Sequence, residues 1–115
     1  MVQDQINRFL RDNCGFDEFR SVLEGDAAIS ENVWRGLSEM GVQGIAIPSL
    51  YGGVDAGYLS LCLAARELGA HLAPVPFSSS IYLAAEAIQR TGSETQKEEW
   101  LPKLVSGEII GTLAV

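Results

Sequence analysis

The residue types that could do chemistry in this chain are few and scattered. His71 is the only histidine, and neither a cysteine nor a carboxylate stands at ligand spacing beside it. The acidic pairs Asp17-Glu18 and Glu98-Glu99 are typical of solvated helix faces rather than of a general acid and base. The two cysteines form no metal or redox motif. The sequence therefore predicts neither a catalytic residue nor a metal site in this chain.

A proline pair followed by small side chains is the better candidate, for a binding surface. The run Ala73-Pro74-Val75-Pro76 should be extended, because each proline disfavours the α conformation in the residue before it. A helix is expected after it, over about residues 77–90. Ser79 and Ser80 leave room near the start of that helix, and Leu83 adds an apolar floor one turn later. Helix-on-helix packing could use the same residues, so both uses stay open.

The last part of the chain, residues 92–115, predicts a capped helix, a glycine stop and an apolar strand. Ser93 and Gln96 have the spacing of a capping box, Pro102 should bend or restart the helix, and Gly107 should end it. Residues 109–115 then favour a strand. A single strand cannot satisfy its own backbone hydrogen bonds, so we expect its neighbours outside this chain and the chain to be part of a longer protein.

Further helices are expected upstream at about residues 2–12, 16–24 and 31–40, from apolar residues at helical spacing. Asp17 and Ser30 are placed to cap the second and third of these helices. Residues 42–56 lack a helical period and should form a fixed loop around a glycine turn.

Residues 57–69 are apolar nearly all round, which is typical of a helix in the middle of a bundle. Cys62 should be a small core residue, and Trp34, Trp100 and Leu101 should anchor the core. The expected fold class is all-α, a bundle of five or six helices over residues 1–108. One C-terminal β-strand, residues 109–115, would lead into a missing β-domain.

Composition bounds the function classes. The 115 residues fit one domain, and 47% hydrophobic with 20% charged residues fits an ordinary globule. The net charge of −7 argues against nucleic acid and against an anionic membrane surface as partners. No apolar run approaches the length of a membrane span, and the start has no signal-peptide pattern, so a cytoplasmic location is expected.

Three motifs resemble the N-terminal helical domain of the acyl-CoA dehydrogenase family, in its order and spacing, over about residues 17–115. Asp55 departs from the family pattern, which often has glycine there, and leaves the exact loop conformation open. The motifs are Trp34-x-x-Leu37-x-x-Met40-Gly41-x-x-Gly44-Ile45-x-Ile47-Pro48 with Tyr51-Gly52-Gly53; Glu67-Leu68-Gly69 followed by Ala73-Pro74-Val75-Pro76-Phe77; and Gly92-Ser93-x-x-Gln96-Lys97-x-x-Trp100-Leu101-Pro102-x-Leu104-x-Ser106-Gly107-Glu108.

The resemblance implies an FAD-dependent enzyme of fatty acid metabolism that performs α,β-dehydrogenation of an acyl-CoA thioester. The family's catalytic glutamate belongs to its C-terminal domain, so this chain alone should neither turn over nor hold FAD tightly. It would instead cover the flavin and form part of the acyl pocket. The acyl pocket would be lined by Val75, Pro76, Ser79, Ser80 and Leu83, and the flavin would be touched by Leu113 and Val115, which could equally belong to a plain core strand.

The partners that the resemblance implies are the acyl-CoA substrate, the remaining domains of the same enzyme, an electron-transfer flavoprotein and further subunits of a homo- or hetero-oligomer. The run Ala73-Pro74-Val75-Pro76-Phe77 resembles bacterial dehydrogenases that act on bulky thioesters, without fixing chain length or sterol specificity. Two rivals stay open. One is an acyl-CoA oxidase, nitroalkane oxidase or flavin monooxygenase on the same scaffold. The other is a free-standing helical interaction module, which would leave no exposed apolar face around residues 77–83.

Overall fold

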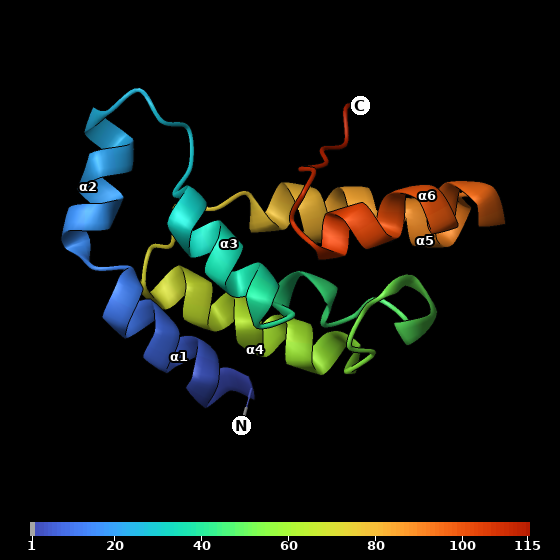
Figure 1. Cartoon of the computed structure of the whole chain (residues 1–115), viewed down its shortest axis with the longest axis horizontal. Helices are drawn as coiled ribbons and strands as arrows, with labels where there is room; N and C mark the ends of the chain where they lie inside the picture. Colours follow the sequence, from blue (N-terminus) through green and yellow to red (C-terminus); the bar gives the residue numbers. More distant parts are fainter. Residues whose placement is uncertain (1) are drawn as a thin grey trace.

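The computed structural model describes residues 2–115, and within that range the regular structure is helical throughout (Figure 1). The all-α class is therefore confirmed, and the number of α-helices is six in the described part. The α-helices are α1 (Val2–Asn13), α2 (Phe16–Glu24), α3 (Glu31–Glu39), α4 (Gly57–Ala70), α5 (Glu86–Thr91) and α6 (Glu94–Val105). Two short 3₁₀ turns, η1 (Val42–Gly44) and η2 (Ser49–Tyr51), and one π-helix, η3 (Ser78–Ala85), complete the elements.

The core has two parts, each built where apolar residues of different helices meet. The larger part joins α1, α3, α4 and the start of η3, with Ile6 and Leu10 of α1 fully buried against Leu37 of α3. Their spacing of four residues places the two α1 side chains on one face of the helix. The smaller part joins η2, the end of η3 and α6 around Leu101 and Leu104. Helix α2 stands apart from both parts and buries none of its own residues (Figure 1).

Helix ends follow the capping chemistry expected from the sequence in most places. The Ser30 hydroxyl accepts the Val33 N–H at the start of α3, and Gly41 takes a left-handed φ of 76° after it. Asp17, by contrast, does not cap α2. Helix α2 begins at Phe16, so the cap position is Gly15, which has no side chain that could cap the helix.

The loop over residues 42–56 is fixed by its own backbone and tied to α6. The Val54 and Ala56 amides donate to the carbonyls of Gly44 and Ile45 at 2.8 and 2.7 Å. Asp55 adopts a φ of 56°, the left-handed region that glycine favours, which explains how an aspartate stands where the family often has glycine.

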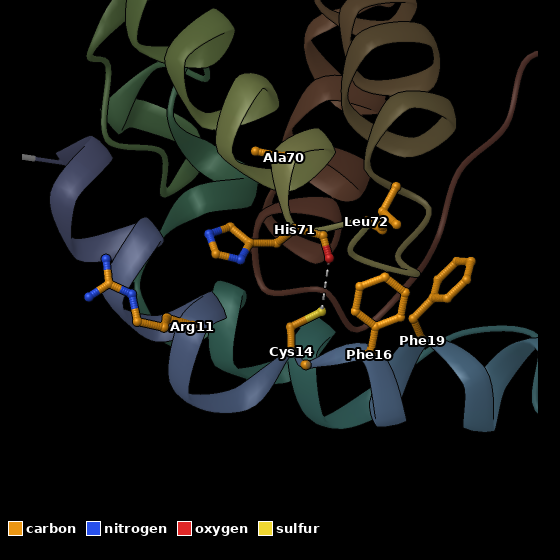
Figure 2. Close-up of a pocket in the computed structure, with 8 residues that line it drawn as sticks. Arg11, Cys14, Phe16, Phe19, Ala70, His71 and Leu72 are labelled. Atoms are coloured by element: carbon orange, nitrogen blue, oxygen red, sulfur yellow. Dashed lines mark hydrogen bonds between the residues drawn. The ribbon is translucent and has the colours of Figure 1, made fainter.

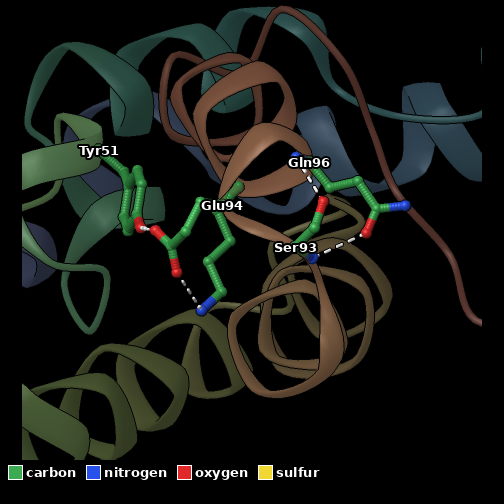
Figure 3. Close-up of polar contacts among 5 residues, drawn as sticks. Tyr51, Ser93, Glu94 and Gln96 are labelled. Atoms are coloured by element: carbon green, nitrogen blue, oxygen red, sulfur yellow. Dashed lines mark hydrogen bonds and ion pairs between the residues drawn. The ribbon is translucent and has the colours of Figure 1, made fainter.

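Helix α6 carries the capping box predicted from its sequence. The Gln96 amide donates to the Ser93 hydroxyl at 3.2 Å, and the Ser93 amide donates to Gln96 Oε1 at 2.9 Å (Figure 3). The Tyr51 hydroxyl donates to Glu94 at 2.9 Å, and this bond raises the pKa of Tyr51 and lowers that of Glu94. Pro102 does not end the helix, which continues to Val105 before Gly107 turns out at a φ of 73°.

Two sequence expectations about this architecture are wrong, and a third stays a prediction. Residues 109–115 form no strand pairing within the described residues, and the strand expected there stays a prediction, because its partners were expected outside this chain. Helix α4 does not lie at the centre of the bundle: Leu59 is 76% exposed and Cys62 is exposed as well. Trp100 is 39% exposed and packs under Lys103 instead of in the core, whereas Trp34 and Leu101 are buried as expected.

Candidate functional site

The segment that follows the two prolines forms a π-helix instead of the expected α-helix. After Pro76, η3 runs over Ser78–Ala85 and passes without a break into α5. Backbone hydrogen bonds in a π-helix join residues five apart, and such stretches frequently occur at functional sites. Residues four apart therefore stay close to one side of η3, so each side can be described by its own row of side chains.

One row of η3 faces the core. Phe77, Ile81 and Ala85 are buried, the first two in the larger core part and Ala85 in the smaller one. The Phe77 ring meets the Tyr82 ring edge to face, with ring centroids 5.5 Å apart. This row holds the helix rigidly, which a wall of a binding pocket requires.

The next row, Ser78, Tyr82 and Glu86, faces a groove against α4. The groove has two hollows, of about 260 and 310 Å³, which share Tyr82 as a wall. Burial, followed by the nearby Cys62 thiol, raises the pKa of Tyr82, so its hydroxyl stays protonated. At the far end the Tyr58 hydroxyl donates to Glu86 at 2.8 Å and closes the groove from α4.

The third row carries two of the residues predicted to line an acyl pocket. Ser79 is half-buried and donates its hydroxyl to the Pro76 carbonyl at 3.2 Å, and Leu83 is 46% exposed. Pro76 and Val75 precede this row, and Val75 also lines the smaller hollow of the groove. The structure thus leaves Ser79 and Leu83 on one side of the π-helix, whereas Val75 lines the neighbouring groove against α4 and Pro76 follows it in the chain.

Ser80, the fifth residue predicted for the pocket, lies in a fourth row on the buried side of η3. It is fully buried, and its hydroxyl accepts the backbone N–H of Gly111 at 3.2 Å. Ala84, four residues on, is buried on the same side. The sequence placed Ser80 with the pocket because its small side chain leaves room, and the contact with a residue 31 positions away had no local signal.

The segment after Gly111 extends away from the helices and ends at the top of the view in Figure 1. Leu113 is 46% exposed and Val115 is fully exposed. Both side chains are therefore open to contact from outside the described residues, as a flavin contact would need. That contact stays a prediction.

A separate hollow of about 240 Å³ opens between α1, α2 and the end of α4 (Figure 2). Cys14 and His71 both line it, but they do not form a catalytic pair. The Cys14 sulfur approaches the backbone carbonyl of His71 at 3.9 Å, not its ring. Burial, then the charge of Glu18, raises the pKa of the Cys14 thiol, which keeps it in the less nucleophilic protonated form.

Two further findings bear on the chemistry. Within residues 2–115, no group of three or more metal-ligating side chains converges. In the same range, no helix has the length and apolar character that crossing a bilayer would require.

Comparison with known proteins gives one consistent family. The family model for the acyl-CoA dehydrogenase N-terminal domain matches residues 1–108. A curated relative, the mitochondrial isovaleryl-CoA dehydrogenase of Arabidopsis thaliana, is 32% identical over 98% of this chain and 28% of its own length.

Two solved structures agree with that match. The Tcur3481-Tcur3483 steroid ACAD G363A variant is similar at a TM-score of 0.89 and 32% identity, over 96% of this chain and 30% of that one. A glutaryl-CoA dehydrogenase from Mycobacterium smegmatis in complex with FADH2 is similar at a TM-score of 0.79 and 26% identity, over 95% of this chain and 28% of that one. The chain spans less than a third of the length of each of these proteins.

Proposed function

The chain belongs to the acyl-CoA dehydrogenase family, as its N-terminal domain, and from that premise we propose that the complete gene product oxidises an acyl-CoA thioester to its α,β-unsaturated form. In this proposal the described residues form one wall of the acyl pocket and cover one side of the flavin. The observation that carries it is the open side of η3, where Leu83 is 46% exposed and Ser79 is half-buried.

The residues of that open side suit an acyl chain. Leu83 offers exposed apolar surface, and the Ser79 hydroxyl already donates to the Pro76 carbonyl, so binding an apolar chain would leave no donor unsatisfied. Val75 lines the neighbouring hollow together with residues at the end of α4, and Pro76 follows it in the chain. A pocket that is mostly apolar with few polar groups is the usual form of a small-molecule site.

The terminal segment suits one part of FAD, the flavin ring. Leu113 and Val115 present exposed apolar side chains, which suit the face of a flavin ring and not a phosphate. When bound, FAD supplies the acceptor for the hydride that leaves the β-carbon of the thioester. These two residues would exclude water from one face of the ring, while tight binding would depend on other parts of the gene product.

The finer points are part of the same proposal. Relatives are named for isovaleryl-CoA and steroid substrates, which supports branched or bulky thioesters as the substrates to test first. An electron-transfer flavoprotein as the oxidant of the reduced flavin, an oligomeric state, a role in fatty acid metabolism and a cytoplasmic location are likewise proposed.

The test is purification of the complete gene product and inspection of its visible spectrum. We expect a flavin band that bleaches on anaerobic addition of a straight-chain, branched or steroid-side-chain CoA thioester. Re-oxidation by an electron-transfer flavoprotein, with slow re-oxidation by oxygen, would support a dehydrogenase, and fast re-oxidation by oxygen an oxidase. A protein that carries no flavin, or whose flavin none of these thioesters reduces, would contradict the proposal.

A further inference from the structure

The segment that leaves α6 is held to the helical body at three points. The Trp34 indole N–H donates to the Gly107 carbonyl at 3.2 Å, and the Ile109 amide reaches the Lys103 carbonyl at 3.4 Å. The third point is the hydrogen bond from the Gly111 amide to the Ser80 hydroxyl at 3.2 Å. This third contact is made by a side chain of η3 and lies two residues before Leu113.

The contact surface around Gly111 admits no side chain there. A Cβ atom placed on Gly111 would lie 2.4 Å from the Ala84 Cβ and 3.3 Å from Leu104 Cδ2. The close approach therefore requires glycine in the segment and a small residue at position 84. We name Ser80, Ala84 and Leu104 the Gly111 seat.

Helix η3 carries two residues of the seat, Ser80 and Ala84, and also Ser79 and Leu83, which we name the acyl wall. The acyl wall faces outward. The neighbouring residues in the chain, Ser80 and Ala84, face Gly111. An extended chain advances roughly 3.3 Å per residue, which places Leu113 within about 7 Å of the seat. A shift of the seat would thus move the acyl wall and the flavin-facing residues relative to each other.

We propose that Ser80 is a positioning residue that fixes the terminal segment against η3, and thereby sets the distance between the acyl wall and the flavin face. The Ser80 side chain is fully buried, so it is not itself part of the exposed acyl wall or of the exposed flavin face at Leu113 and Val115. The inference rests on the proposed function, because the two surfaces are those of the acyl pocket and the flavin contact. Reacting atoms misplaced by about 1 Å can slow an enzyme on the order of a hundredfold, so a single hydrogen bond at this place has leverage on turnover.

The first test replaces Ser80 in the complete, FAD-loaded gene product. Ser80→Ala removes the acceptor at nearly constant size, and we expect amide exchange at Gly111 to become at least about twofold faster and kcat to fall about two- to tenfold with KM little changed. Ser80→Cys keeps a weaker acceptor at nearly the same size and should give values of both quantities between those of Ser80→Ala and the unsubstituted protein. Ser21→Ala on the exposed α2, where the Ser21 hydroxyl donates to the Glu18 backbone carbonyl, is the control for removing a serine hydroxyl elsewhere. A rise in KM at constant kcat would mean that Ser80 contacts substrate instead, and would overturn the inference.

A second test approaches the seat from the other side. Gly111→Ala alone should lower kcat and alter the flavin spectrum, because its methyl group meets Ala84. Combining it with Ala84→Gly removes that clash and should recover kcat at least about threefold over the single variant. A double variant no better than the single one would overturn the inference.

The two proposals fail in different ways. An unsubstituted gene product without FAD would contradict the proposed function and the flavin part of the inference together. Unchanged Gly111 exchange and kcat in Ser80→Ala, in a protein that does hold FAD, would overturn the inference alone.

Discussion

The carboxylate of Glu67 on α4 accepts a hydrogen bond from the side-chain amide of Asn7 on α1 at 2.7 Å. Gln3, one turn earlier on α1, donates to the other carboxylate oxygen at 2.6 Å. These bonds, that from Asn7 first, lower the pKa of Glu67 below its ordinary value near 4.5. The carboxylate thus joins the two helices that pack most extensively in the bundle, and it does so in its charged form.

This linkage predicts a defined dependence of stability on pH. Because the pKa of Glu67 is lower in the folded than in the unfolded state, its contribution is present above about pH 4.5 and is lost as pH falls through the folded pKa. Glu67→Gln should lower the thermal unfolding midpoint at neutral pH and lose part of the acid dependence. The measurement is thermal unfolding by circular dichroism between about pH 3 and 7. Glu99→Gln, on the exposed side of α6, is the control, and equal behaviour of the two variants would refute the linkage.

The two tryptophans should differ sharply in their contribution to stability. Trp34 is buried and donates its indole N–H to Gly107, so Trp34→Ala should reduce the free energy of unfolding by about 3–5 kcal/mol. Trp100 is 39% exposed and its ring centroid lies 5.2 Å from the Lys103 ammonium nitrogen, so Trp100→Ala should cost about 1 kcal/mol or less. Urea unfolding of both variants measures the difference. Equal losses in the free energy of unfolding would contradict this prediction and show that Trp100 is packed as tightly as Trp34.

The features predicted correctly from the sequence depend on chemistry within a few residues. The capping box of Ser93 and Gln96 and the helix stop at Gly107 follow from backbone geometry that nearby residues decide. The exposure of Cys62 could not be predicted in this way. An apolar helix has no polar face to show which side stays open.

The π-helix and the Gly111 seat were missed for different physical reasons. The residues of η3 are equally compatible with an α-helix, and no signal within a few positions of the sequence selects the wider turn. The hydrogen bond between Ser80 and Gly111 joins positions 31 apart and leaves no periodic pattern in the sequence. Ser79 and Leu83 were chosen from the sequence because a small side chain leaves room and an apolar one gives a floor, and their role in a pocket stays a prediction.

Two glycines should respond in opposite directions to alanine. At Gly53 a Cβ would lie 1.9 Å from the Ile47 carbonyl oxygen, so Gly53→Ala must displace the loop and should destabilise the fold by about 1–3 kcal/mol or more. At Gly69, inside α4, a Cβ would meet no atom within 4 Å, and Gly69→Ala should stabilise the fold by about 0.5–1 kcal/mol. Chemical denaturation of the two variants checks the signs. A Gly53→Ala variant as stable as the unsubstituted protein would show that the loop is not fixed as the structure describes.

The acyl wall makes the last prediction, on substrate choice in the complete gene product. Leu83 points outward from η3, so Leu83→Trp adds bulk to the predicted pocket without disturbing the core. We expect kcat/KM for long or branched acyl thioesters to fall about tenfold or more relative to a short one, since one methylene of misfit alone is worth roughly that much. Leu23→Trp on α2, where Leu23 is 69% exposed, makes the same exchange at a site away from η3 and should leave the ratio unchanged. Equal effects on all chain lengths would place the acyl chain elsewhere, because only a side chain that touches the chain can discriminate by its length.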